Sequence, residues 1–183
     1  LGLPSIGLYI IASSLDAPAI LTFAVFCFGF AFGAEGDIVA FLVARILLAL
    51  IFISSGIAKL ADPTPTADMI GMAGLPAPAV LAYLAGVFEL SAGVAVLIGF
   101  QTRIAAGALA LFCLFTAFVF HSGAMAIPGF PPEANGLLTM MNATMMWKNI
   151  TLAGGYLLLA VVGAGSISVD VRLKGSAGLA AAA

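Results

Sequence analysis

The sequence has few charged side chains. Its 183 residues include six lysines and arginines, eight aspartates and glutamates, and one histidine. Charged residues make up 8% of the chain, against about 25% in soluble domains. The basic residues stand singly, without the patch or arm that binds phosphates. The composition therefore excludes an ordinary soluble domain and a nucleic-acid-binding protein.

Residues that ligate metals and redox clusters are also scarce. The chain has two cysteines, Cys27 and Cys113, and no CxxC motif. Two cysteines are too few for an iron–sulfur cluster or a disulfide framework, and a single histidine, His121, cannot supply two haem ligands. We therefore expect no metal site and no covalently bound cofactor, and we interpret both cysteines as small buried apolar residues.

Long apolar runs are what the sequence has in abundance, since 63% of its residues are hydrophobic. About 20 residues of helix cross the ~30 Å hydrocarbon core of a bilayer. Five runs approach that length, at 17–34, 38–58, 79–100, 104–120 and 150–167. Proline and glycine fall between the runs, where turns are expected. The sequence predicts an all-α integral membrane protein: an antiparallel four-helix bundle with an additional N-terminal membrane helix at 17–34.

Three parts of the chain follow from this pattern: an N-terminal segment at 1–36, a four-helix transmembrane domain at 37–174 and a tail at 175–183. Two segments exceed what a four-helix bundle needs, namely the N-terminal helix and the connection from Ser122 to Met146. The methionine-rich end of that connection, before Trp147, predicts a helix at the membrane interface. We expect both segments to bind other membrane subunits, and the remaining surface to contact the lipid bilayer.

Basic residues predict the orientation in the membrane. Four of them fall at one end of the predicted bundle and two at the other: Arg45, Arg103, Arg172 and Lys174 against Lys59 and Lys148. Because basic residues are enriched on the cytoplasmic side, we expect the end with four, which includes the C-terminus, to be cytoplasmic.

Two charges, Arg45 and Glu89, lie inside predicted membrane helices. A charge deep in a bilayer costs about 2.5 kcal/mol or more unless it is paired or hydrated. The estimated depths of the two residues are similar, and Gly86 and Gly93 share the Glu89 face of the helix. We therefore predict an Arg45–Glu89 ion pair, which either fixes the helix register or forms part of a proton or quinone site.

A second polar cluster is predicted at the opposite end of the bundle. Lys59, His121 and Lys148 each lie at a helix end, and antiparallel packing brings those ends together. Arg45 and Lys59 also share one face of the first bundle helix, with Leu48, Phe52 and Ser55 between them. A histidine there can bind a quinone carbonyl, shuttle a proton or simply be satisfied by water or backbone.

Several short motifs follow one another in a distinctive order. They are ARI at 44–46, FISSGIAKL at 52–60, GLP at 74–76, GVFELSAG at 86–93, LIGFQTR at 97–103, FH at 120–121, WKN at 147–149, GG at 154–155 and GAGSISVD at 163–170. In this order and spacing the chain resembles the DoxX family of four-helix bacterial membrane proteins.

The resemblance implies a multi-pass protein of the bacterial inner (cytoplasmic) membrane that associates with redox partners. Those associations are quinone-linked thiosulfate oxidation, a terminal quinol oxidase, and assemblies with superoxide dismutase and sulfurtransferase. It would carry over the following functional residues: Arg45, Lys59, Glu89, Arg103, His121, Lys148 and Asp170.

Three functional hypotheses remain. The first is an accessory or anchoring subunit of a quinone-linked respiratory or photosynthetic electron-transfer complex, not catalytic alone. The second is a quinone-binding oxidoreductase subunit, like a thiosulfate:quinone oxidoreductase or a quinol oxidase, whose catalytic candidates Arg45, Glu89, His121 and Lys148 relay protons. The third is a small-molecule or ion carrier. A quinone or a lipid is the expected bound molecule.

Overall fold

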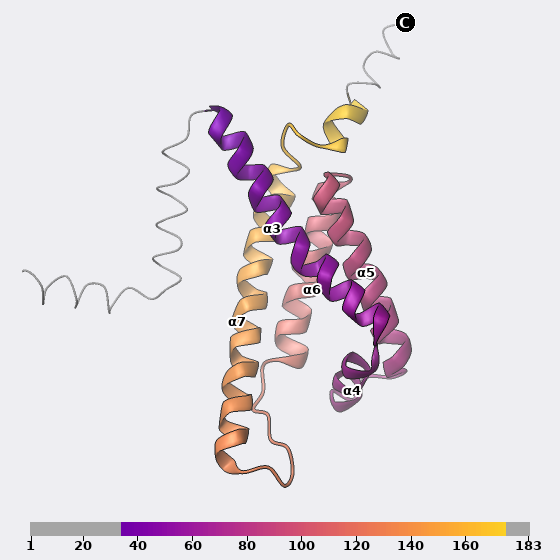
Figure 1. The fold of residues 1–183 in the computed structure, drawn as a ribbon, viewed down its shortest axis with the longest axis vertical. Coiled ribbons are helices and arrows are strands. Elements are labelled where there is room, and N and C mark those ends of the chain that lie inside the picture. Colours follow the sequence, from indigo (N-terminus) through magenta and orange to yellow (C-terminus); the bar gives the residue numbers. More distant parts are fainter. Residues whose placement is uncertain (1–33, 175–183) are drawn as a thin grey trace, which may run out of the picture. The chain divides into compact units, whose positions relative to one another are not determined.

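The computed structural model describes residues 34–174, and the regular elements of this part are helices. In chain order these are α3 (Ala34–Ala61), α4 (Thr64–Met72), α5 (Pro78–Ile98), α6 (Thr102–Phe120) and α7 (Pro132–Val162), as Figure 1 shows. The N-terminal helix predicted at 17–34 lies outside the described residues except for its last position, and the tail predicted at 175–183 lies outside them entirely. The chain separates into two units, Leu1–Phe41 and Leu42–Ala183, and the contacts described below lie within the second.

Four of these helices are long and apolar enough to cross a membrane. Their spans are Ile38–Ala61, Pro78–Ile98, Thr102–Phe120 and Pro132–Val162. Neighbouring spans are antiparallel: Ile53 of α3 faces Gly93 of α5, whereas Lys59, further along α3, pairs with Glu89, earlier in α5. The prediction of an all-α membrane bundle of four helices is confirmed.

The short helix α4 occupies a stretch that the sequence predicted only as a connection. Its prolines suggested a loop, but a proline in the first turn of a helix has no N–H that needs a partner there. Asp62 Oδ1 also accepts a hydrogen bond from the Thr64 N–H at 3.0 Å. The helix buries Ile70 and packs against α5, so it covers part of the bundle.

Helix α7 spans Pro132–Val162, whereas the sequence predicted 150–167, so the helix is longer than predicted but ends five residues earlier. Polar residues such as Asn142 and Thr144 lower the hydropathy of this stretch without breaking the helix. The predicted connection from Ser122 to Met146 is therefore wrong for most of its length, and its methionines belong to α7. At 31 residues and 1.5 Å per residue the helix is about 46 Å long, and Figure 1 shows it running on past the end of α6.

Small residues bring α3 and α5 close together. A Cβ added to Gly56 would lie 2.6 Å from the Leu90 backbone N and 2.8 Å from the Gly86 carbonyl O. A Cβ on Gly93 would lie 3.0 Å from Ile53 Cγ1. Membrane helices depend on such close backbone approach because lipid gives them no hydrophobic reason to associate.

The surface of the described helices is largely apolar. On the four membrane-spanning helices, the most exposed large apolar side chains are Leu47, Ile104, Leu111, Leu158 and Val161. An apolar surface of this extent would be an aggregation hazard in water, whereas lipid tails solvate it. The membrane-spanning helices therefore contact the lipid bilayer, as predicted.

The chain after α7 closes one end of the bundle. Arg45 donates hydrogen bonds from its guanidinium to the Ala164 carbonyl and, at 2.8 Å, to the Ile167 carbonyl. A Cβ on Gly99, which has a φ of +73°, would lie 2.5 Å from Ser168 Cβ and 3.0 Å from Arg45 Nη1. Only a glycine fits this crossing. We call this group of contacts between Arg45 and residues 164–168 the Arg45 clasp.

Asp170 continues the closure by capping α6. Its carboxylate accepts hydrogen bonds from the backbone N–H groups of Gln101 at 2.8 Å and Thr102 at 3.0 Å, and its own N–H donates to the Gly99 carbonyl at 2.9 Å. Free N–H groups at a helix N-terminus favour such a partner. Burial alone would raise the pKa of Asp170, but the backbone hydrogen bonds from Thr102 and Gln101 outweigh it and hold that pKa below its ordinary value of 3.8.

This cap predicts an acid-sensitive contribution to stability. Because the folded pKa of Asp170 is depressed, its stabilisation is complete above the unfolded value of 3.8 and is lost as the pH falls through the folded value. We expect Asp170→Asn to cost about 1 kcal/mol of unfolding free energy at pH 6 and less at pH 2. Unfolding in detergent at both pH values measures this, with the exposed Asp68→Asn as control. A cost that stayed equal at the two pH values would contradict the prediction.

Candidate functional site

A cavity of about 720 Å³ lies among the helices on the side of the bundle away from the Arg45 clasp. All five described helices contribute to its wall. Its polar lining residues are Ser55, Lys59, Thr66, Glu89, Thr116, His121, Lys148 and Asn149. The rest of the wall is apolar. Cavities of about 300–1,000 Å³ with mostly apolar walls and a few polar groups are typical of small-molecule sites.

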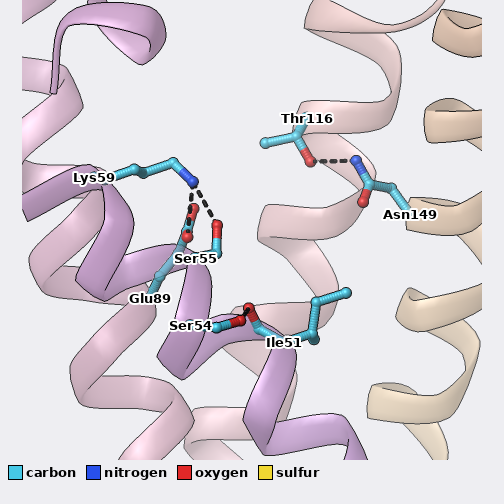
Figure 2. A network of polar contacts seen from close by, with 7 residues as sticks. All are labelled: Ile51, Ser54, Ser55, Lys59, Glu89, Thr116 and Asn149. Atoms are coloured by element: carbon cyan, nitrogen blue, oxygen red, sulfur yellow. Dashed lines mark hydrogen bonds and ion pairs between the residues drawn. The ribbon is translucent and has the colours of Figure 1, made fainter. Parts of the chain in front are cut away.

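An ion pair between α3 and α5 forms the charged part of the wall. Lys59 Nζ lies 3.0 Å from Glu89 Oε2 and donates a second hydrogen bond to Ser55 Oγ at 2.6 Å (Figure 2). The Glu89 side chain is 3% exposed and that of Lys59 21% exposed. The carboxylate is therefore buried, and the ammonium that neutralises it still borders the cavity.

The predicted Arg45–Glu89 pair is wrong, because each residue has another partner. Arg45 faces Gly99, which follows the last turn of α5, whereas Glu89 lies ten positions earlier and faces Lys59. The reason is the helix register: Arg45 lies level with the end of α5 at Gly99, and Glu89 is ten residues, about 15 Å, away along that helix. The shared face of α3 is correctly predicted, since Arg45 and Phe52 are both buried.

His121 lies at the end of α6 and is held by α7. Its Nδ1 is 2.8 Å from Asn142 Oδ1, and Asn142 Nδ2 donates to the Gly123 carbonyl at 2.9 Å. Since the amide nitrogen already serves Gly123, Nδ1 must donate to Asn142 Oδ1. A neutral His121 therefore keeps its proton on Nδ1 and presents the lone pair of Nε2, which can accept a proton or a hydrogen bond.

The α6–α7 side of the wall carries a second polar pair. Asn149 Nδ2 donates to Thr116 Oγ1 at 3.1 Å, and Thr116 Oγ1 donates to the Cys113 carbonyl at 3.0 Å. Figure 2 shows this pair across from Lys59 and Glu89. Lys148, next to Asn149, is exposed and lines the cavity. The structure thus brings Lys59, His121 and Lys148 to one cavity and adds Glu89, which was predicted to face elsewhere.

Aromatic rings make up much of the apolar wall. Phe52 and Phe112 meet edge to face with ring centroids 6.2 Å apart, and Phe88 lies 5.2 Å from Phe112. Behind them the buried Tyr156 contacts Phe52 and donates its hydroxyl hydrogen to the Leu48 carbonyl at 2.6 Å. This hydrogen bond ties α7 to α3. The rings form a rigid apolar surface suited to a flat molecule.

Two amide side chains of α7 were not among the predicted site residues. Asn142 and Asn149 are both buried, and a spacing of seven residues places them on one face of a helix. Two amides on one face of a membrane helix are a signal in themselves, because a buried amide needs a partner in a bilayer. Recognising that 132–149 is helical would have been enough to find them.

The fold and the cavity define a helical membrane protein with a partly polar cavity between its helices. The DoxX family model matches residues 40–122, and the chain belongs to the DoxX family, as its motifs predicted. Inner membrane protein YqjF of Escherichia coli K12 is 38% identical over 139 residues, which cover 74% of this chain and 93% of that protein. Inner membrane protein YphA of the same organism is 34% identical over 143 residues, with coverages of 78% and 96%. No solved structure matches the chain.

Proposed function

We propose that this chain is an accessory inner-membrane subunit of a quinone-linked electron-transfer system, and that its cavity holds the quinone headgroup. The observation that carries the proposal is the Lys59–Glu89 pair in the wall of an aromatic-lined cavity. A buried pair of opposite charges that borders a cavity is a functional candidate in a membrane protein. The location rests on the relatives named as inner membrane proteins, and the basic end of the bundle favours a cytoplasmic C-terminus.

The donor set fits a quinone ring. Lys59 and Lys148 carry N–H groups that can donate to carbonyl oxygens, while the rings of Phe52, Phe88 and Phe112 offer an apolar face. A quinone supplies reversible chemistry of two electrons and two protons when it is bound.

The residues of this chain contribute proton handling. The Glu89 carboxylate lines the cavity beside Lys59, and a carboxylate in such a place can donate or accept a proton in a reaction. The Nε2 atom of His121 can accept one as well. Arg45 takes no part, because its guanidinium is committed to the Ala164 and Ile167 carbonyls. The proposal assigns electron delivery to a partner protein, since one histidine and two cysteines do not ligate a haem pair or a cluster.

The test is a titration of the purified full chain with a short-tailed benzoquinone, followed by calorimetry. We expect saturable binding that Lys148→Met weakens about tenfold, because a hydrogen bond from a charged donor contributes about 1.5 kcal/mol or more. Lys174→Met changes a basic residue outside the cavity and should bind as the unmodified chain does. Absence of saturable binding, or equal affinities for the two variants, would refute the headgroup site.

A further inference from the structure

Three apolar residues of the membrane-spanning helices line the cavity and are also exposed. They are Leu84 of α5 and Leu111 and Phe115 of α6, with exposed fractions of 58%, 69% and 48%. A side chain that lines a cavity and is about half exposed stands at an opening of that cavity. We call these three residues the lateral rim.

The lateral rim lies at the depth of the lipid tails. Leu111 is at the middle of α6 (Thr102–Phe120), and Leu84 is six residues into α5, about 9 Å from its start. The neighbouring outward-facing side chains Val87 and Phe118 are also exposed and apolar. A molecule that crosses the rim therefore comes from the hydrocarbon layer and not from water.

The course of α5 and α6 explains why the wall is thin at this place. A short turn at Gly99–Gln101 joins the two helices beside the Arg45 clasp. From that turn they separate toward their other ends, as Figure 1 shows. The cavity-lining residues of both helices lie in these separated parts, within 81–89 of α5 and 108–120 of α6.

We propose that the lateral rim is a lateral opening through which the ligand enters the cavity from the bilayer. The ligand is a membrane-dissolved molecule with a polar headgroup and a long apolar tail. This inference rests on the proposed function and specifies the substrate class of the same site. Glu89 is five residues from Leu84 on α5, about 7.5 Å along the helix. A headgroup beside the Lys59–Glu89 pair thus leaves its tail at the rim.

The size of the cavity supports the same arrangement. A volume of about 720 Å³ accommodates a ring and its first substituents, but a polyprenyl chain of many units needs more space. The tail passes between Leu84 and Leu111 into the lipid, where an apolar chain has no cost of hydration. The rim side chains then contact the tail and not the headgroup, which separates their role from that of Lys59 and Lys148.

The experiment compares two probes on the full chain in nanodiscs: a benzoquinone with a decaprenyl tail and the same ring with a methyl group in place of the tail. Leu84→Trp and Leu111→Trp fill the rim from different helices. Ile104→Trp is the matched control, because Ile104 is exposed on α6 and does not line the cavity. If a tryptophan variant fails to fold, Leu84→Phe and Leu111→Phe make the same change in smaller steps.

We expect both rim variants to weaken binding of the tailed quinone about tenfold, the loss expected from about two methylene contacts. Binding of the tail-less ring should change less than about twofold, and the control should leave both unchanged. Equal effects of the rim variants on the two probes, or no effect on either, would refute the lateral opening but not the headgroup site. Failure of the unmodified chain to bind either probe would refute both the proposed function and the lateral opening.

Discussion

Replacing Lys59 by methionine is expected to lower the free energy of unfolding by about 3 kcal/mol. The substitution leaves the Glu89 carboxylate, 3% exposed, without the only ion-pair partner that it has among the described residues. An uncompensated charge in a buried position costs about 3–5 kcal/mol, and the partial exposure of Lys59 places the effect at the lower end. Detergent-induced unfolding followed by Trp147 fluorescence measures the loss.

A second substitution shows whether the charge or the lost packing is responsible. Because a buried pair can be replaced by apolar residues at little net cost, the double variant Lys59→Met, Glu89→Met should recover most of the stability. Lys148→Met removes an exposed lysine from the same cavity and should change stability by less than about 0.5 kcal/mol. If Lys59→Met were no more harmful than Lys148→Met, the pair would not stabilise the bundle.

A methyl group added at Gly56 is expected to cost about 2 kcal/mol of stability. The new Cβ in Gly56→Ala meets backbone atoms, the Leu90 N at 2.6 Å and the Gly86 O at 2.8 Å, and backbone atoms cannot swing aside as the end of a side chain can. The helices α3 and α5 must therefore separate, and overpacking of this kind costs about 1–3 kcal/mol. The thermal midpoint of the purified protein reports the change.

Two other helical glycines provide the control for intrinsic helix propensity. Within the described residues, a Cβ on Gly107 or Gly154 meets nothing within 4 Å beyond its own helical surroundings. Alanine favours a helix over glycine by up to about 1 kcal/mol, so Gly107→Ala and Gly154→Ala should leave stability unchanged or raise it slightly. A Gly56→Ala variant as stable as these two would show that the α3–α5 crossing is looser than the structure describes.

The sequence predicted the number of spans and the positions of the first three, since run length and hydropathy are local properties and a bilayer demands them. It also predicted which face of α3 is buried, because Arg45 and Phe52 follow helical spacing. The partner of Glu89 could not be predicted in the same way. Which residues form an ion pair depends on the register of the two helices. In the observed register Lys59, and not Arg45, lies beside Glu89.

The long α7 was missed for a different physical reason. Hydropathy detects lipid-facing residues. Asn142, Thr144 and Lys148 lower the hydropathy of this stretch, although they lie in a helix whose polar groups contact the bundle, a loop or the interface. The capping of α6 by Asp170 joins segments nearly seventy positions apart, and nothing local signals it. The candidate site was therefore only partly predictable: its lysines and histidine were found at helix ends, while its two amides were not.

The Arg45 clasp and the cavity lie toward opposite ends of the bundle, so the two ends differ in structure. The carbonyl groups of residues 164 and 167 accept hydrogen bonds from the guanidinium at one end. The cavity lined by Lys59, Glu89 and His121 lies toward the other end. Arg45 and Lys59 are 14 residues apart on α3, about 21 Å along the helix. Arg45 is not among the residues that line the cavity, so a substitution that disrupts the clasp is expected to alter the stability of the bundle and to leave the cavity wall in place.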